Sequence, residues 1–482
     1  MIAQGSSAFA LAASGSASSP ADITIGAGHG WLDGWQLNNP HEVTLASQPH
    51  PVDDADFGSG GALAIKALVR YVDPVEEPAL ADTALGNAQA SGRTLVDWQV
   101  FPLPLDEDGA ASCTAAAQSP AWQAITAPSS GTLAFRVEAS PASLDPCSLT
   151  PEGGYARLEN LLYRIEVHAG EADAAVPDVD GPRFGLEGLR ITFSRRNASL
   201  MARVTKVSGT EITVSPAARD PRSWFAPGQY AEIVSRHDDL DTRTASAAQR
   251  LFRIAAASDT RVTLEASPAQ LAASGITADG DWYLRLWDAF PDGSGTRTIA
   301  LDASGLSQVI DLGDGLAVQL GGGSAARLRR GDFWTCAARA DGTIEWPTSS
   351  GQFARVTPQG PETRYALLGT YALADSALVL GDCRVAFAPL TEQIQVLALG
   401  GDGQSVRADT HTNALVALPS DLRVGVVRGS TPLAGQTIRF RVIAGGGELG
   451  AGSQTLDALT DTEGVARAAW SLGPDAPAQE VE

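Results

Sequence analysis

Glycine and proline interrupt this chain at short intervals. The 482 residues include 50 Gly and 28 Pro, which fall between short segments where apolar and polar residues alternate. Alternation with a period of two is typical of half-buried strands, and turn-forming residues between such segments are typical of antiparallel sheets. We therefore predict an all-β, multidomain chain of β-sandwich or β-barrel-like modules with little helix. The clearest predicted strands are 164–168, 189–194, 211–215, 230–235, 261–266, 282–287, 316–320 and 437–443.

Helical spacing of apolar residues is rare. Only 244–254 and 267–274 show it, each long enough for a turn or two. The first 20 residues are mostly small and lack the basic segment of a secretory signal, so we predict an opening strand and a loop there. No apolar run approaches the roughly 20 residues that cross a bilayer, and we expect no membrane insertion.

The length suggests roughly three domains, at about 150 residues for each. Stretches that resemble linkers lie at 170–182, which is rich in Ala, Asp and Pro, and near 382–396. We predict an N-terminal β domain at 1–150, a central β domain or domains at 151–390, and a C-terminal domain at 391–482.

The charge of the chain argues against nucleic acid as a partner. Lys and Arg total 34 against 56 Asp and Glu, which gives a formal net charge of −22. A surface of this sign repels phosphate backbones.

The cysteines Cys113, Cys147, Cys336 and Cys383 show no CxxC or His-bearing spacing, so we predict no zinc site. Cys113 and Cys147 lie in neighbouring predicted loops, which makes them a candidate disulfide in an oxidising compartment. The alternative is that all four are buried free thiols.

Two predicted strands carry candidate site residues. In 164–168, Glu166 and His168 lie on one face, where they could begin a metal or acid–base site. No third ligand is near in sequence, so we favour a solvated face with a cross-strand ion pair. In 282–287, Tyr283, Arg285 and Trp287 share a face that, if exposed, would bind a glycan or a protein. The alternative, which we favour, is a strand buried on both faces.

The remaining motifs indicate no enzyme. The acidic runs Asp53, Asp54, Asp56 and Asp238, Asp239, Asp241 lack the Gly and terminal Glu of a calcium loop, which favours solvated loop acids. There is no GxSxG, P-loop or HExxH sequence. The Gly-rich stretch 312–324 lies between predicted strands and not before a helix, which argues against a phosphate-binding loop. Trp334 and Trp346 flank a predicted hairpin, where such aromatic residues are more often part of the core than a ligand platform. We therefore assign no catalytic, cofactor-binding or metal-binding residue and expect no cofactor.

The segment "DPCSLTPEGGYARLENLLYRIEVH" at 145–168 resembles the signature of an uncharacterised bacterial domain family. Similar segments occur at 24–39, 92–100, 193–199, 283–288, 329–347 and 382–390, so the resemblance covers about residues 20–390. It implies association with phage-tail-like contractile injection loci and supplies no catalytic residues. Relatives of this type begin with a further segment, so a shortened version is expected here.

The stretch 391–482 resembles bacterial Ig-like domains of the invasin and intimin type. The resemblance rests on "TPLAG" at 431–435, on Gly445–Gly447 and on "DTEGVA" before Trp470. It implies a sandwich in which Val424, Val426, Ile438, Phe440 and Val442 point inward. The chain stops where such a sandwich has another strand, so we expect a module that is incomplete or completed by a partner.

Together these features predict a non-enzymatic structural or surface-presenting component of a phage-tail-like particle or an extracellular assembly. Its expected partners are proteins or further copies of itself, with a glycan as an additional candidate. One alternative is a carbohydrate-binding or carbohydrate-cleaving protein that uses the 282–287 face and an acidic pair including Glu345. Another is a cell-surface adhesin with a Cys113–Cys147 bridge and pairing at its C-terminal edge.

Overall fold

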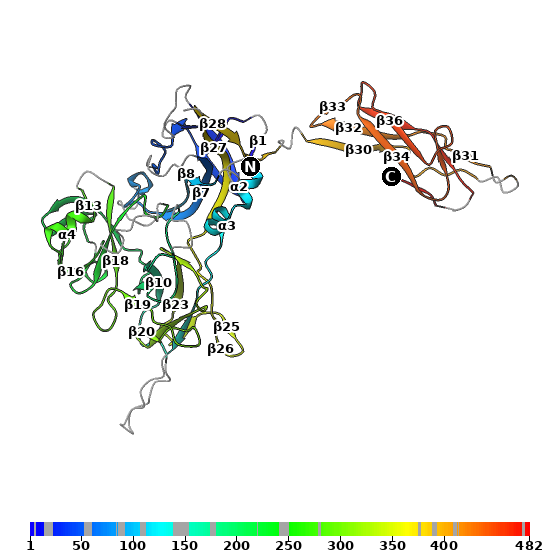
Figure 1. Ribbon diagram of the computed structural model, residues 1–482. Helices are drawn as coiled ribbons and strands as arrows, with labels where there is room; N and C mark the ends of the chain where they lie inside the picture. Colours follow the sequence, from blue (N-terminus) through cyan, green and yellow to red (C-terminus); the bar gives the residue numbers. More distant parts are fainter. Residues whose placement is uncertain are drawn as a thin grey trace. The chain divides into compact units, whose positions relative to one another are not determined.

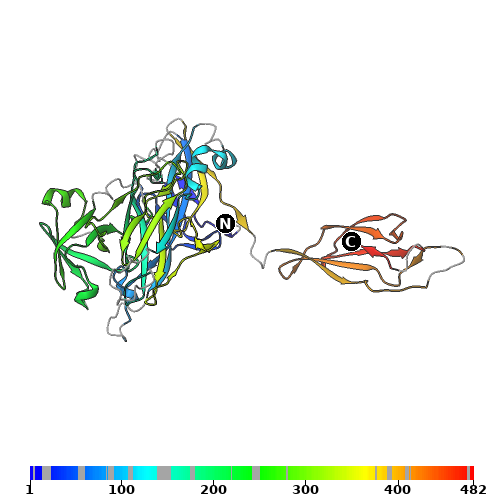
Figure 2. The same cartoon turned by 90° about the horizontal axis from the view of Figure 1, so that it is seen from below.

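The computed structural model describes residues 1–3, 6–13, 23–52, 60–82, 84, 92–106, 112–137, 154–173, 180–218, 220–240, 250–277, 281–374, 377–387, 393–407, 412, 414–474 and 478–482. They form two compact units, which are described separately. The larger unit is Ser7–Arg384, and the smaller one combines Met1–Ser6 with Val385–Glu482. Strands dominate both units (Figures 1 and 2), which confirms the predicted all-β class. The predicted domain boundaries at 150 and 390 stay predictions.

One part of the larger unit is a four-stranded antiparallel sheet with the strand order β28-β27-β7-β8. The strands are β28 (Ala377–Asp382), β27 (Thr363–Ala374), β7 (Gly60–Val72) and β8 (Arg93–Pro104). Two short helices, α2 (Cys113–Gln118) and α3 (Pro120–Thr126), lie beside this sheet in cyan in Figure 1. Ala116 of α2 and Ile125 of α3 pack on Phe101 and Leu103 of β8 and so bury the apolar side of the sheet.

The largest core lies between two further sheets. A five-stranded sheet consists of β19 (Arg297–Thr298), β12 (Arg190–Ser194), β10 (Leu161–Ala169), β23 (Phe333–Ala338) and β24 (Ile344–Glu345), in that order. A three-stranded sheet consists of β20 (Ile310–Gly313), β21 (Leu316–Gly321) and β9 (Thr132–Val137). Tyr163, Ile165 and Val167 of β10 point into this core, with Trp334 and Trp346. The hairpin residues Trp334 and Trp346 are therefore core residues.

A closed six-stranded barrel forms the third part of the larger unit. Its order is β13 (Met201–Ser208), β14 (Glu211–Ser215), β17 (Arg261–Leu264), β16 (Leu251–Ala257), β15 (Tyr230–Ser235) and β18 (Trp282–Trp287). Alternate residues such as Ala231, Ile233, Leu284 and Leu286 fill its interior. Closure pairs every strand on both sides, so the barrel has no free edge. The helix α4 (Pro268–Ala273) and the 3₁₀ turn η5 (Pro221–Ser223) lie in its connections.

Short elements complete the larger unit. One three-stranded sheet consists of β2 (Leu11–Ala13), β3 (Ile23–Ile25) and β6 (Val43–Thr44). Three two-stranded sheets consist of β4 (Gly28–Leu32) with β5 (Trp35–Asn39), β11 (Arg183–Phe184) with β22 (Leu328–Arg329), and β25 (Thr348–Ser349) with β26 (Gln352–Phe353). The 3₁₀ turn η3 spans Pro78–Leu80.

The smaller unit surrounds a core that includes Phe440, Leu449 and Trp470. In its first sheet, β32 (Leu422–Arg428) pairs with β30 (Ile394–Gly400), β33 (Thr431–Pro432) and β37 (Val465–Ala468). A second sheet has the order β31 (Val416–Ala417), β38 (Trp470–Leu472), β35 (Glu448–Leu449), and a third has the order β36 (Thr455–Leu459), β34 (Thr437–Ala444), β39 (Glu480–Val481). The strands β1 (Ile2–Ala3) and β29 (Ala386–Phe387) form a two-stranded parallel sheet.

All eight of the clearest predicted strands are present, with ends that differ from the prediction by no more than three residues. The helix predicted within 267–274 is confirmed as α4. The helix predicted within 244–254 is wrong where the structure describes it, because residues from Leu251 onward belong to β16 in the barrel wall. Residues 244–249 lie outside the described residues. The helices α2 and α3 were not predicted.

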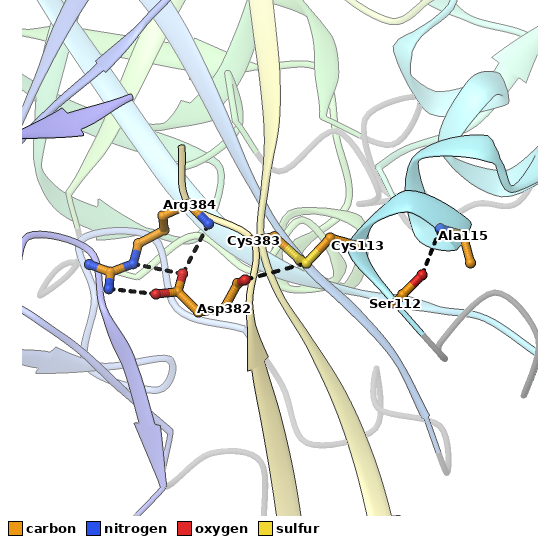
Figure 3. The surroundings of a disulfide bond; sticks show 6 residues. All are labelled: Ser112, Cys113, Ala115, Asp382, Cys383 and Arg384. Atoms are coloured by element: carbon orange, nitrogen blue, oxygen red, sulfur yellow. Dashed lines mark hydrogen bonds and ion pairs between the residues drawn. A yellow bond between two sulfur atoms is a disulfide. The ribbon is translucent and has the colours of Figure 1, made fainter. Parts of the chain in front are cut away.

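A disulfide joins α2 to the end of the first sheet (Figure 3). Cys113 at the start of α2 is bonded to Cys383, which directly follows β28, across a sequence separation of 270. The predicted Cys113–Cys147 bridge is therefore wrong, as is the alternative of four free thiols; Cys147 lies outside the described residues. Ser112 fixes the helix beside the bridge, because its hydroxyl accepts a hydrogen bond from the Ala115 amide at 3.1 Å. Cys336 is free and buried.

We predict that Cys113→Ser combined with Cys383→Ser lowers the free energy of unfolding by about 2–5 kcal/mol, because the bridge restricts a long loop in the unfolded chain. Denaturant titration of oxidised protein and of the variant measures the difference. Peptide mapping of unreduced protein provides the control and should recover a Cys113–Cys383 crosslink. A Cys113–Cys147 crosslink would contradict the assignment.

Candidate functional site

The candidate face on β18 is buried. Tyr283 and Trp287 are 2% and 1% exposed. Leu284 and Leu286 point into the barrel. Tyr283, Arg285 and Trp287 alternate with them along the strand and therefore project from the outer wall of the barrel. There Trp287 donates a hydrogen bond from Nε1 to Oε2 of Glu232 at 2.7 Å. This burial rules out the exposed ligand face and agrees with the alternative, a strand covered on both sides.

Strand β10 lies opposite this outer wall of the barrel. Its second face carries Glu166 and His168, which are only 7% and 4% exposed. Glu166 pairs with Arg164 of the same strand at 2.5 Å, and its other oxygen lies 3.9 Å from Arg285 of β18. The predicted solvated face is therefore wrong, because the barrel covers it. We call this contact between β10 and the β15–β18 wall the charged junction.

Within the charged junction, His168 is a neutral residue. Its Nδ1 lies 3.8 Å from Oε1 of Glu232, and Arg330 approaches the same oxygen at 3.7 Å. Burial, together with the positive charges of Arg330 and Arg190, lowers the pKa of His168 to about 3. No group of three His, Cys, Asp or Glu side chains in the described part of the chain is arranged to hold a metal ion. The junction thus packs the barrel through charges and hydrogen bonds.

A second buried cluster centres on Lys66 of β7. Its ammonium group donates hydrogen bonds to Oδ1 of Asp180 at 2.7 Å and to the Leu240 carbonyl at 2.6 Å. Tyr365 of β27 donates a hydrogen bond to Oδ2 of Asp180 at 2.5 Å. Since Leu240 follows the barrel strand β15, this cluster links the first sheet to the barrel.

A histidine pair forms a third link. Nδ1 of His50 lies 3.1 Å from Nδ1 of His237, and Nε2 of His50 lies 2.8 Å from Oδ1 of Asp97 in β8. Arg70 of β7 approaches the other oxygen of Asp97 at 3.3 Å. Burial, the neighbouring His50 and Arg236 lower the pKa of His237. A hydrogen bond between the two Nδ1 atoms needs one of them protonated as the donor and the other unprotonated as the acceptor.

Each acidic candidate in the described part of the chain lies near an arginine. Asp238 forms a buried ion pair with Arg250 at 2.8 Å, so it is not the solvated loop acid that we predicted. Asp239 lies 3.9 Å from Arg285. Glu345 is exposed and paired with Arg339. The remaining candidates, Asp53, Asp54, Asp56 and Asp241, lie outside the described residues.

The sequence reasoning missed a cleft beside the barrel. It has a volume of about 190 Å³, and four arginines line it with only one acidic residue. Its lining residues are Arg157, Leu161, Ser194, Arg195, Arg196, Leu200, Arg222, Trp224, Gln229, Leu286 and Asp288. The adjacent Arg195 and Arg196, in a chain with a large acidic excess, were the available signal in the sequence. This arginine cleft is the candidate binding site of the larger unit.

We predict that acidification destabilises the larger unit through His168. The unfolded chain protonates this histidine near pH 6.5, whereas the folded chain does so only near 3, so stability falls as the pH drops between these values. The free energy of unfolding falls by up to about 1.4 kcal/mol per pH unit because of this one histidine. Urea unfolding at pH 7.5 and 5.0 measures it. His168→Gln should reduce the pH dependence, and exposed His41→Gln should not; equal dependence in His168→Gln and the unmodified protein would refute the assignment.

We also predict that Lys66→Met costs about 3 kcal/mol of stability, because it removes the cation 2.7 Å from the buried Asp180 carboxylate and leaves the more distant Arg329, at 3.7 Å. Adding Asp180→Asn should restore part of the loss. The exposed barrel pair Arg253–Glu265 supplies the control, since Arg253→Met should leave the denaturation midpoint almost unchanged. A Lys66→Met loss no greater than that of Arg253→Met would contradict the role given to the cluster.

The comparisons with known proteins give a family and no activity. No helix in the described part of the chain is long and apolar enough to span a membrane. Neither the curated proteins nor the solved structures contain a match. The model of a family of unknown function, DUF6519, matches residues 106–432, a span that includes the barrel and extends into the smaller unit. Because this match covers more than half of the chain, the protein belongs to the DUF6519 family.

Proposed function

We propose that this protein is a non-enzymatic structural or surface-presenting component of an extracellular or phage-tail-like assembly. In this proposal the smaller unit is an Ig-like module that joins the protein to a second copy or to another β protein. The sequence resemblances over residues 20–390 and 391–482 motivate the kind of assembly. The observation that carries the proposal is the exposed apolar strand β30.

Strand β30 has apolar side chains in contact with solvent on both faces. Ile394, Val396, Leu397 and Leu399 are 55%, 64%, 39% and 44% exposed. Among the described strands, β30 pairs only with β32, along one of its edges. An unprotected apolar edge is a template for pairing with another strand, and natural proteins usually block such edges with charge or proline. Exposed apolar patches also mark protein interaction sites.

The larger unit suits a scaffold role. An ion pair between Glu166 and Arg285 and a hydrogen bond from Lys66 to the Leu240 carbonyl connect its sheets to the barrel. A third connection runs from Asp97 through His50 to His237. Breaking such a contact leaves a buried polar or charged group without that partner, so each contact opposes displacement of the barrel. A rigid unit repeated in an assembly gains avidity from contacts that are weak one at a time.

The carbohydrate alternative has lost its supporting feature. It depended on an exposed Tyr283, Arg285 and Trp287 face, and both rings are buried. The adhesin alternative included a Cys113–Cys147 bridge, whereas Cys113 is bonded to Cys383. Neither is proposed here as the primary function.

We predict that the full chain self-associates through β30. Light scattering coupled to size-exclusion chromatography should give a mass above that of one chain, with the oligomer favoured at higher concentration. Val396→Lys should shift the protein to the monomer, because a charge on the edge opposes strand pairing.

Leu459→Lys is the matched control, since Leu459 on β36 is 66% exposed and lies outside this sheet. It should leave the mass unchanged. A full chain that is monomeric at all concentrations, or an oligomer that Val396→Lys does not affect, would overturn assembly by self-pairing.

A further inference from the structure

The arginine cleft lies between the barrel and the five-stranded sheet. The turn after β12 supplies Arg195 and Arg196, the barrel supplies Leu286 and Asp288 at the end of β18, and Arg222 and Trp224 come from the connection before β15. It therefore contains residues from both structural parts, which fix its shape.

Ion pairs and hydrogen bonds hold one lining residue of the cleft, Arg195, in place. Arg195 donates a hydrogen bond from Nε to Oδ2 of Asp314 at 2.6 Å, and its NH1 lies 3.2 Å from Oδ1 of Asp288. Asp288 also accepts hydrogen bonds from the Arg195 amide at 2.7 Å and from Gln229 at 3.2 Å. Although burial opposes it, hydrogen bonding to Asp314 and the charge of Asp288 raise the pKa of Arg195. Both carboxylates are thus already engaged by Arg195.

Two of the other arginines have guanidinium groups that can still bind a ligand. Arg196 and Arg222 are exposed, and within the described residues no hydrogen-bond or ion-pair partner of either guanidinium group is present. The third, Arg157, pairs with the exposed Glu159 at 2.6 Å. The hydrogen bond from Arg157, with the charges of Arg157 and Arg196, lowers the pKa of Glu159. Positive groups therefore concentrate at one place on a chain whose net charge is −22.

We propose that the arginine cleft binds the oxyanion of a small ligand, a carboxylate, sulfate or phosphate group, through Arg196 and Arg222. A guanidinium group presents a planar fork of N–H donors that matches such an anion. Arg195 and Arg157 line the cleft but are already paired with Asp288, Asp314 and Glu159, so the free binding capacity lies with Arg196 and Arg222. Leu161, Leu200 and Leu286 supply apolar surface beside the arginines. A nucleic-acid strand is a poor candidate, because the net charge of −22 on the chain repels a polyanion.

Isothermal titration calorimetry of the full chain tests this inference. The probes are inorganic phosphate, sulfate and glucuronate, each at constant ionic strength set with sodium chloride. We expect saturable binding of at least one probe, weakened at least tenfold by Arg196→Gln combined with Arg222→Gln. The probe that binds most tightly identifies the class of anion.

Arg93→Gln combined with Arg407→Gln is the matched control, since both side chains are exposed and lie outside the cleft. It removes the same charge and should keep the affinity. Absence of saturable binding, or equal weakening by both double variants, would overturn the proposal. The Val396→Lys chain should bind the anion normally, so this test is independent of assembly through β30.

Discussion

Buried carboxylates fix how the larger unit is put together. A charge removed from water needs partners at hydrogen-bonding or ion-pairing distance, and unpaired burial is costly. Glu166, Glu232 and Asp180 each find such partners on a different element: Arg285 on β18, Arg330 before β23, and Lys66 on β7. Two of these pairs, Glu166–Arg285 and Glu232–Arg330, join the barrel to the part that contains the five-stranded sheet, so a shift of the barrel would break both. Apolar packing fills each part, and the ion pairs set how the parts meet.

The strands could be read from the sequence because alternation is a local property. The pattern at 164–168 correctly placed Tyr163, Ile165 and Val167 on one face, and they do enter the core. It could not say what covers Glu166 and His168, because that depends on a barrel formed from residues after 200. The same limit explains the face at 282–287 and the disulfide. Cys147 is near Cys113 in sequence, whereas Cys383 is brought close only by the pairing of β27 and β28 in the finished sheet.

The missed helices had a readable signal at their starts. Ser119 is followed by Pro120, and a capping serine before a proline in the first turn is typical of a helix start. Their apolar faces are too short to produce a clear helical period. The arginine cleft is different, because its residues come from four separate segments. Sequence alone offered only the Arg195 and Arg196 pair, with no indication that Arg222 would lie near it.

The bridge between Cys113 and Cys383 also determines how mechanical tension would travel. The chain enters the larger unit at Ser7 and leaves it at Arg384, next to Cys383. A pull between these two points passes along residues 7–113 and then directly through the sulfur–sulfur bond. The barrel, the arginine cleft and the five-stranded sheet lie inside the covalent ring closed by that bond. They are therefore shielded from stretching as long as the disulfide is intact, and reduction would place them in the path of the force.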